Sequence, residues 1–425
     1  MIAKPARIQF IESIRGIAAF VVVFAHIITA LDSPPVTGLP ASLAGANPVV
    51  RTVGMIAFWP LGTGRLPVAI FFVLSGMALS QGYLRGGGLG YLQSAAIRRY
   101  FRLMIPCLIS VLFAYSLLHA NLMHNHEAAG IILAEGGQAP WIDVAYTYRW
   151  TFEDTIREGM WNIFFSDQSA FAEGRLNSVL WTMRPELIGS FIVFCFLALF
   201  GRHGNSAGLA FAITALLALS GFTMLALFPM GVGLAIVRHN SPNLRLSRTM
   251  AAVLILTGLW LGGLYDYSGD WKMRIPVVHS VVNSADAAPC LGAVFVVLGL
   301  VLTPAICAAL ERKVFLWLGK ISFGLYLCHV PIIMSAGCWL YVVSRGQGLT
   351  HGEAILAVTG AVVPLSLLGG WILYYCADKP SVLLGKALAS RLLAERSSFR
   401  ENSTVETVYH PSVRTVGTPT VGSQL

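Results

Sequence analysis

Charged residues are scarce in this sequence. They make up 12% of its 425 residues, about half the share of an ordinary soluble protein, whereas 56% of the residues are hydrophobic and the mean hydropathy is +0.70. This balance excludes a soluble globular domain and indicates a polytopic membrane protein. The net charge of +9 does not indicate nucleic-acid binding, because the basic residues follow a membrane topology, as described below.

Several patterns that would point to other classes of protein are missing. All seven cysteines lie in or beside apolar segments, so there is no disulfide framework. There is no Gly-x-Ser-x-Gly elbow. The cluster of His119, His124, His126 and Glu127 does not follow a standard zinc spacing, so no metal site is expected. No internal repeat stands out, which weakens an inverted-repeat transporter, and the first apolar run is interpreted as a retained helix rather than a cleaved signal peptide.

Ten apolar segments, most of them about 17–25 residues long, have the length of membrane spans. They fall near 13–31, 66–84, 103–120, 179–200, 207–224, 226–238, 249–265, 288–304, 316–342 and 354–376. Pro229, Gly231 and Gly233 interrupt the sixth, so segments five and six could instead form one kinked or re-entrant element. The predicted fold class is all-α: a polytopic membrane helix bundle with about ten transmembrane helices.

The distribution of basic residues supports ten spans and gives them a direction. With ten spans, 18 Lys and Arg residues fall on the side of the two termini, whereas the opposite loops hold eight of them and 13 of the 20 acidic residues. The positive-inside rule therefore places both termini in the cytoplasm. A nine-span arrangement would scramble this pattern.

The chain divides into one membrane domain and a tail. The membrane domain covers residues 1–385 and includes a long loop, about 121–178, that is acidic and aromatic. This loop is expected to lie at the non-cytoplasmic interface as short amphipathic pieces. The cytoplasmic tail, 386–425, is rich in Ser, Thr and Val after about residue 395, so its end is expected to be disordered.

The first apolar segment contains two ionisable residues in the stretch ESIRGIAAFVVVFAHI. Arg15 and His26 are eleven positions apart, which places them within about 20° on one helix face and ~16 Å apart along the axis. A ligand with an anionic head and an extended arm could hold its head at Arg15 and its tip at His26. Coenzyme A (CoA) thioesters have that shape. The alternative is an arginine that reaches the interface and a histidine satisfied within the core.

Three arginines precede the third segment, in the stretch IRRYFRLMIP. Arg99 and Arg102 share a helix face, and Arg98 is adjacent to them. Their forked donors could clamp phosphate groups. The alternative is ordinary positive-inside charge.

Two further ionisable residues fall deep within apolar segments. Glu186 lies about two turns into the fourth segment, and His329 lies ~20 Å along the ninth from Leu316, so both reach a depth similar to that of His26. A neutral histidine can act as a general base, and a carboxylate can fix its tautomer. Glu186 could instead pair with Arg184 or with a cation on another helix, and His329 could make a purely structural hydrogen bond.

Taken in order, these residues resemble the membrane-bound acyltransferase family 3. The family motifs are matched by Arg-x10-His at Arg15 and His26, FFVLSG at Phe71 to Gly76, Arg-x-x-Arg at Arg99 and Arg102, W-[ST]-L-x-x-E at Trp181 to Glu186 with Met183 in place of Leu, lG-x-iS-[YF]-x-lYL-x-H-x-P at Leu318 to Pro331, and acidic-Lys-Pro at Asp378 to Pro380. The resemblance spans about residues 7–385 and is greatest to the subgroup of filamentous fungi, which often works on small specialised metabolites. Arg184-Pro185 departs from the usual small or apolar pair before the glutamate.

The resemblance implies acyl transfer from acyl-CoA to an acceptor, usually a hydroxyl. It implies that His26 is the catalytic residue and that Arg15, Arg99 and Arg102 contact the coenzyme. The chemistry agrees, because a hydroxyl is a poor nucleophile until a base removes its proton and a site at the bilayer midplane excludes hydrolytic water. Whether His26 acts on the acceptor directly or carries the acyl group stays open.

We therefore predict an integral-membrane O-acyltransferase that moves an acyl group, expected to be acetyl, to a hydroxyl of a small specialised metabolite or a sugar. The predicted catalytic residues are His26, Glu186 and His329, and the predicted coenzyme contacts are Arg15, Arg98, Arg99 and Arg102. Acyl-CoA is a co-substrate, no cofactor is bound permanently, and the other partners are the acceptor and the lipid bilayer. The multi-pass protein is expected in an endomembrane or the plasma membrane if its source is a eukaryote. The alternative function is a transporter that uses His26, Glu186 and His329 as a proton or substrate relay.

Overall fold

The structure is a computed structural model that describes residues 9–33, 64–166, 175–263 and 286–406. Within these ranges the regular structure is helical and contains no strand, as the all-α prediction requires. The main helices are α1 (Gln9–Leu31), α3 (Arg65–Gly82), α4 (Gly88–His119), α9 (Met183–Phe200), α10 (Ser206–Leu219), α11 (Thr223–Asn240), α12 (Arg248–Gly262), α15 (Ala287–Val301), α16 (Pro304–Leu310), α17 (Lys313–Ile332), α18 (Cys338–Gly346), α19 (His351–Leu373) and α20 (Lys379–Glu406). Short segments of tighter or wider helix join them: η2 (Tyr83–Gly87), η4 (Ser178–Thr182), η5 (Ile333–Gly337) and η6 (Tyr374–Asp378).

Each of the ten predicted segments falls on a helix, but fewer helices have the length and apolar composition of a span. Five continuous helices in the described ranges qualify: Gln9–Leu31, Arg65–His119, Ser178–Phe200, Lys313–Gly346 and His351–Ala394. A sixth qualifies if Ala287–Val301 and Pro304–Leu310, which are bent by 90°, form one broken span. The structure therefore supports an integral membrane protein, and the count of ten spans and the cytoplasmic termini stay predictions.

Two of the predicted segments lie within the helical stretch Arg65–His119, which is broken by a turn between them. Gly86 and Gly88 have φ values of 92° and 56°, which L side chains rarely adopt. Just before this turn, Gly82 packs against the ring of Tyr91. α3 and α4 are therefore separate arms joined by the turn at η2.

Segments five and six form two helices rather than one kinked element. α10 and α11 are joined by three residues in which Gly221 has a φ of 84°, and they pack along one another with Phe211 seated on Gly233. Pro229 lies inside α11, and Gly231 allows the α11 backbone to approach Val73 of α3 closely. The small residues of this segment thus permit close packing between helices.

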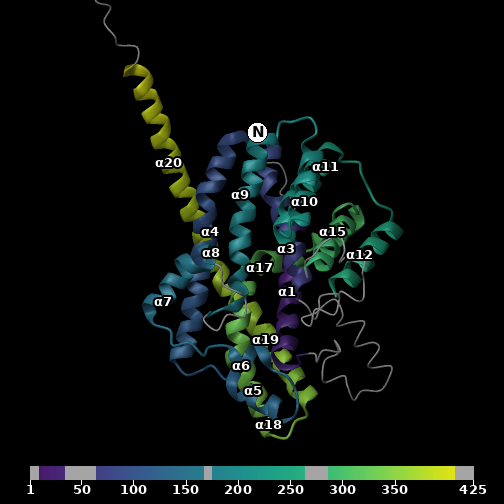
Figure 1. Ribbon diagram of the computed structural model, residues 1–425, viewed down its shortest axis with the longest axis vertical. Coiled ribbons are helices and arrows are strands. Elements are labelled where there is room, and N and C mark those ends of the chain that lie inside the picture. Colours follow the sequence, from purple (N-terminus) through teal and green to yellow (C-terminus); the bar gives the residue numbers. More distant parts are fainter. Residues whose placement is uncertain (1–8, 34–63, 167–174, 264–285, 407–425) are drawn as a thin grey trace, which may run out of the picture.

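The described part of the long loop folds into short helices at one end of the bundle, and its predicted place at the non-cytoplasmic interface stays a prediction. These are α5 (Asn125–Ala134), α6 (Pro140–Val144), α7 (Phe152–Arg157), η3 (Glu158–Asn162) and α8 (Ile163–Phe165). α5, α6 and α18 lie together at this end, opposite the end from which α20 projects (Figure 1). Trp141 and Trp150 are buried, whereas Trp161 is exposed. We call this layer the cap.

Polar groups fix the cap to the bundle. The backbone N–H of His124 donates to the carbonyl of Met334 in η5 over 3.1 Å. The Asn125 amide donates to the carbonyls of Ile142 and Ala145, which ties α5 to α6. Glu158 is buried, and burial raises the pKa of its carboxyl while nearby Arg175 partly opposes that rise.

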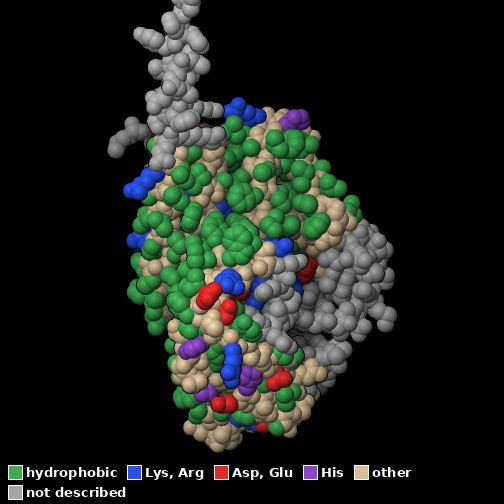
Figure 2. Space-filling model, turned by 60° about the vertical axis from the view of Figure 1, so that its left-hand side comes forward, with side chains coloured by type: hydrophobic (Ala, Val, Ile, Leu, Met, Phe, Trp, Pro, Cys, Tyr) green, Lys and Arg blue, Asp and Glu red, His purple; other side chains and the backbone are tan. Residues whose placement is uncertain are grey.

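The outer surface divides into an apolar and a polar part. Hydrophobic side chains cover most of the bundle on the face shown in Figure 2, whereas acidic residues and histidines gather toward the cap. Exposed Phe113 of α4 and Ile188, Phe191 and Leu199 of α9 belong to the apolar surface of the bundle. Such a surface suits contact with lipid acyl chains.

The predicted tail begins inside a helix. α20 packs its first part on α4 and continues to Glu406, beyond residue 386, where the predicted tail starts. The predicted disorder after about residue 395 falls partly within this helix, and residues 407–425 lie outside the described residues.

Candidate active site

Two glycines set the register between α1 and α17. Gly16 and Gly319 face one another so closely that a side chain at either position would overlap the backbone of the opposite helix. Ten residues further along each helix, His26 meets His329. The two helices therefore run parallel, and the equal spacing brings both histidines to the same height.

The two imidazole rings meet edge to edge. Nδ1 of His26 lies 2.8 Å from Nε2 of His329, the ring centroids are 5.0 Å apart and the ring planes are inclined by 17°. Because the centroid distance exceeds the nitrogen–nitrogen distance by nearly two ring radii, the rings form an in-plane hydrogen bond rather than a stack.

A backbone carbonyl determines which nitrogens carry protons in this pair when both rings are neutral. Nδ1 of His329 lies 3.2 Å from the carbonyl oxygen of Leu325, which can only accept, so Nδ1 carries the proton and Nε2 is the acceptor. Nδ1–H of His26 must then be the donor to His329. His26 consequently keeps its lone pair on Nε2, which makes no hydrogen bond within the described residues.

The cap and α3 surround His26. The ring of Trp141, from α6, lies 5.2 Å from the His26 ring, inclined by 46°. On another side, a Cβ at Gly64, just before α3, would lie 3.7 Å from Nε2, so the absence of a side chain leaves room there. His329 is fully buried, whereas His26 stays partly accessible.

A cavity is bounded by residues of α1, α3, α4, η4, α9 and α17, and neither His26 nor His329 is among its lining residues. Its polar lining contains Arg15, Ser75, Arg99, Arg102, Thr182, Glu186, Ser322 and Tyr326. Its apolar lining contains Val68, Phe71, Phe72, Leu103, Met183 and Phe323. Arg15 therefore faces the cavity, whereas the ring of Tyr326 lies 5.8 Å from that of His329, one helical turn away. The cavity thus combines the cationic side chains of Arg15, Arg99 and Arg102 with Tyr326, whose ring lies near that of His329.

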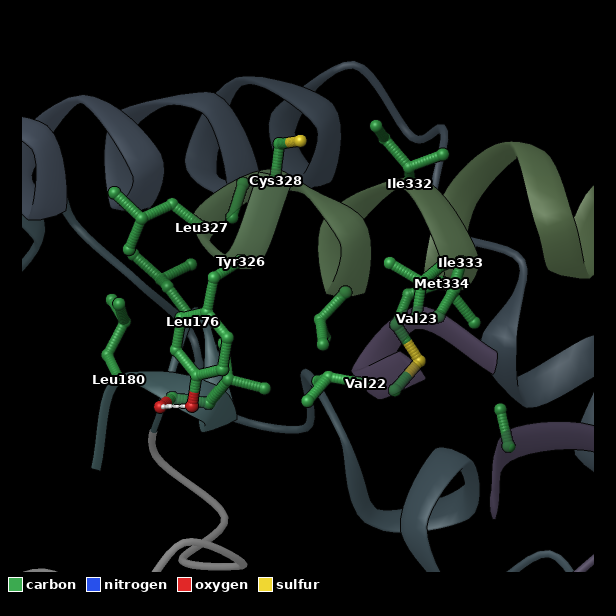
Figure 3. Packing of buried hydrophobic residues seen from close by; sticks show 14 of the residues in the cluster. Val22, Val23, Leu176, Leu180, Tyr326, Leu327, Cys328, Ile332, Ile333 and Met334 are labelled. Carbon is green, nitrogen blue, oxygen red and sulfur yellow. Dashed lines mark hydrogen bonds between the residues drawn. The ribbon is translucent and has the colours of Figure 1, made fainter. Parts of the chain in front are cut away.

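Tyr326 lines the cavity and lies beside His329. Its hydroxyl donates to the carbonyl of Val179 over 2.9 Å and lies 3.0 Å from Oγ1 of Thr182. Tyr326 also belongs to an apolar cluster in which side chains of α1, α17, η5 and the segment 176–180 meet (Figure 3). These contacts fix its ring in the wall of the cavity.

Glu186 is paired with an arginine rather than with a histidine. Its carboxylate accepts from the Arg99 guanidinium and, over 2.7 Å, from the hydroxyl of Ser75. Nε of Arg99 donates to Oγ of Ser190 over 2.6 Å, and Arg99 and Glu186 are only 7% and 8% exposed. The pairing of Glu186 with a cation on another helix, one of the alternatives left open by the sequence, is therefore the one observed.

The other predicted arginines differ in what they face. Nε of Arg15 is buried and has no hydrogen-bond partner among the described residues, and its guanidinium lies 6.0 Å from the Phe71 ring centroid. Arg102 lines the cavity. Arg98 does not: its Nε donates to the carbonyl of Ser94 and its stem lies against Gly385 of α20. Arg98 is four residues before Arg102 and about 40° from it around the helix, so its position is explained by the packing of α20 on α4 and not by helical periodicity.

Comparison with known proteins decides the family. The model of a family described as an acyltransferase domain, acyltransferase family 3, matches residues 8–375. The chain belongs to this family. No curated protein and no solved structure matches it significantly. It is a membrane acyltransferase, in agreement with the resemblance found in the sequence.

In this acyltransferase the sequence motifs converge on one place although they are far apart along the chain. The motif residues Arg15, Ser75, Arg102, Glu186 and Tyr326 come from five helices and all line the cavity. Ser75 and Gly76 of the FFVLSG motif have different roles. Ser75 faces the cavity and bonds Glu186, whereas Gly76 allows the close approach of α11.

Sequence reasoning missed two residues of the acyltransferase site. Tyr326 lies three residues before His329, and this spacing places the two side chains on one helix face, so the sequence contained a signal for it. Trp141 comes from the cap, and nothing in its local sequence indicates that it reaches His26.

Proposed function

We propose that the protein transfers an acyl group, in our proposal acetyl, from acyl-CoA to a hydroxyl of a small acceptor, with His26 as the general base. The observation that carries the proposal is the hydrogen bond between Nδ1 of His26 and Nε2 of His329, backed by the Leu325 carbonyl. This chain of contacts leaves a lone pair on Nε2, as a general base requires. His329 acts through His26 and is a positioning residue.

The proposed reaction needs one proton site. The acceptor hydroxyl gives its proton to Nε2 of His26 while its oxygen attacks the thioester carbonyl carbon. A tetrahedral intermediate collapses, the carbon–sulfur bond breaks, and the CoA thiolate takes the proton back from Nε2. Atoms and charge balance without a metal or a redox partner.

Donor binding is assigned to the arginine-lined cavity. Arg15 and Arg102 both face it, and Arg15 has a buried Nε to offer to an anion. The ~16 Å between Arg15 and His26 along α1 suits an extended pantetheine arm between the diphosphate and the thioester. Arg99 contributes charge to the cavity wall, but much of its donor capacity is used by Glu186 and Ser190.

The acceptor is proposed to be a small specialised metabolite or a sugar, in keeping with the fungal subgroup that the sequence resembles. Trp141 supports an acceptor side beneath the cap, because its ring lies 5.2 Å from that of His26. A flat aromatic surface suits the apolar face of a small amphipathic molecule better than an anionic one.

A transporter relay through His26, Glu186 and His329 is not favoured. Such a relay requires the carboxylate to exchange protons with the histidines. Glu186 is bonded to Arg99 and Ser75, while the histidines are bonded to one another.

Sided membrane vesicles test the proposed donor and its direction of entry. Because the arginines are predicted at the cytoplasmic face, acyl-CoA added to that face alone should release free CoA thiol when the acceptor is present. The thiol is measured by a colorimetric reagent. Reaction only from the opposite face would contradict the topology or the role of the arginines, and no thiol release from either face would exclude acyl-CoA as donor.

Arg102→Ala should raise the KM for acyl-CoA about tenfold or more and change kcat little, because it removes a charged contact made equally in the ground and transition states. Arg98→Ala is the matched control: the neighbouring arginine lies against α20 and its loss should leave KM unchanged. Steady-state kinetics with purified protein gives both constants. A fall in kcat with an unchanged KM would show that Arg102 does not hold the donor.

A further inference from the structure

Two lysines and two tyrosines form a cluster beside the arginine-lined cavity. Nζ of Lys320 on α17 lies 4.8 Å from the ring centroid of Tyr374 and 5.2 Å from that of Tyr375, and it donates to the Tyr375 hydroxyl over 3.3 Å. Nζ of Lys379 lies 5.7 Å from the Tyr375 ring centroid. Lys320, Tyr375 and Lys379 are exposed. Two ammonium groups and a phenol thus gather around one aromatic pair.

The two helices that carry the lysines also carry residues that line the cavity or contact its lining. On α17, Lys320 comes just before Ser322 and Phe323, both of which line the cavity. On α20, Lys379 comes just before Ser381, whose hydroxyl donates to the backbone carbonyl of Arg102 over 3.5 Å. The cluster is therefore tied to the cavity through α17, which lines it, and through the contact of α20 with Arg102, while its own four side chains are not among the lining residues.

The charge of this region is positive even when its acidic neighbour is counted. Asp378 precedes Lys379 and carries one negative charge, whereas Lys320, Lys379 and Arg102 carry three positive charges. Cations held against tyrosine faces are oriented by the ring quadrupole while keeping their remaining N–H donors. An anion with an aromatic group attached would find charge and stacking surface together.

We propose that this cluster binds the 3′-phosphoadenosine end of the acyl-CoA donor. The inference rests on the proposed function and adds the residues that recognise the nucleotide end. The 3′-phosphate is a monoester with nearly two negative charges, which suits Lys320, Lys379 and the Tyr375 hydroxyl. The adenine ring can stack on an exposed tyrosine face. The diphosphate then lies toward Arg15 and Arg102, and the thioester toward His26.

A lipid-facing belt of Tyr and Lys is the competing explanation, since such residues collect at membrane interfaces. Two observations favour the nucleotide. The lysines converge on the same ring of Tyr375 instead of reaching outward separately. The helices of the cluster also contribute Ser322 to the cavity lining and, through Ser381, a hydrogen bond to the backbone of the lining residue Arg102.

Equilibrium binding of CoA and 3′-dephospho-CoA tests the inference. The purified wild type should bind CoA about tenfold more tightly than 3′-dephospho-CoA. In the double variant Lys320→Gln/Lys379→Gln, CoA binding should fall to the level of 3′-dephospho-CoA, whose own binding should stay unchanged. Lys386→Gln, an exposed lysine on α20, is the matched control and should keep the wild-type preference.

Other outcomes would overturn the inference. Equal weakening of both compounds in the double variant, or no preference in the wild type, would show that the lysines do not contact the 3′-phosphate. The measurements are repeated in nanodiscs of phosphatidylcholine with and without phosphatidylserine. A lysine effect that depends on the anionic lipid would assign the cluster to headgroups. A wild type that binds neither compound would exclude CoA as donor altogether, which is a failure of the proposed function itself.

Discussion

His26→Ala should abolish acyl transfer while the protein still inserts and binds acyl-CoA. Nε2 of His26 is the proposed base, and a positioned base typically contributes about 10²–10⁴-fold to the rate. Donor binding should survive, because Arg15 and Arg102 lie at the cavity and His26 is not among its lining residues. The measurements are thiol release for turnover and equilibrium binding for the donor. Wild-type turnover in this variant would remove His26 from the mechanism.

Two substitutions of His329 test whether its hydrogen bond positions His26. His329→Ala removes the acceptor of the His26 Nδ1–H bond, so the ring loses its fixed orientation and the rate should fall about 10²-fold. His329→Gln offers an amide oxygen that can accept the same hydrogen bond, and it should keep more activity than His329→Ala. Equal activity of the two variants would mean that the hydrogen bond does not position His26.

The sequence predicts the features that depend on a single helix. Helical periodicity places Arg15 and His26 along one face of the first span, and it places Arg99 and Arg102 together, which the cavity lining confirms for the arginines. Periodicity does not exclude Arg98, a further predicted coenzyme contact that lies about 40° from Arg102 around the helix. Its place against Gly385 follows from the packing of α20 on α4, which no local pattern indicates.

Features that depend on which helices are neighbours could not be predicted. Gly16 and Gly319 are separated by some 300 residues, and only their contact shows that His26 and His329 share a height and bond directly. Which residue pairs with Glu186 also depends on which helices are neighbours. Local spacing offers the adjacent Arg184, yet the close approach of α3, α4 and α9 selects Arg99. Trp141 reaches His26 because the cap folds back, which no local pattern encodes.

The pair of Arg99 and Glu186 should govern stability as well as donor binding. Both side chains are at least nine-tenths buried, and each satisfies the other together with Ser75 and Ser190. Removing one partner leaves an uncompensated buried charge, which costs about 3–5 kcal/mol. Arg99→Met and Glu186→Gln should therefore each lower the unfolding temperature in detergent strongly.

The double variant distinguishes a paired role from two independent ones. Arg99→Met/Glu186→Gln removes both charges at once, and the glutamine oxygen can still accept from the Ser75 hydroxyl. Replacing a buried ion pair by neutral groups of similar size is often close to neutral, so the double variant should unfold at a higher temperature than either single variant. Additive losses would show that the two residues act separately. If the double variant is stable but binds acyl-CoA weakly, the charge of Arg99 serves the donor in addition to the fold, because the structural cost has then been removed and only the electrostatic contribution to the cavity is missing.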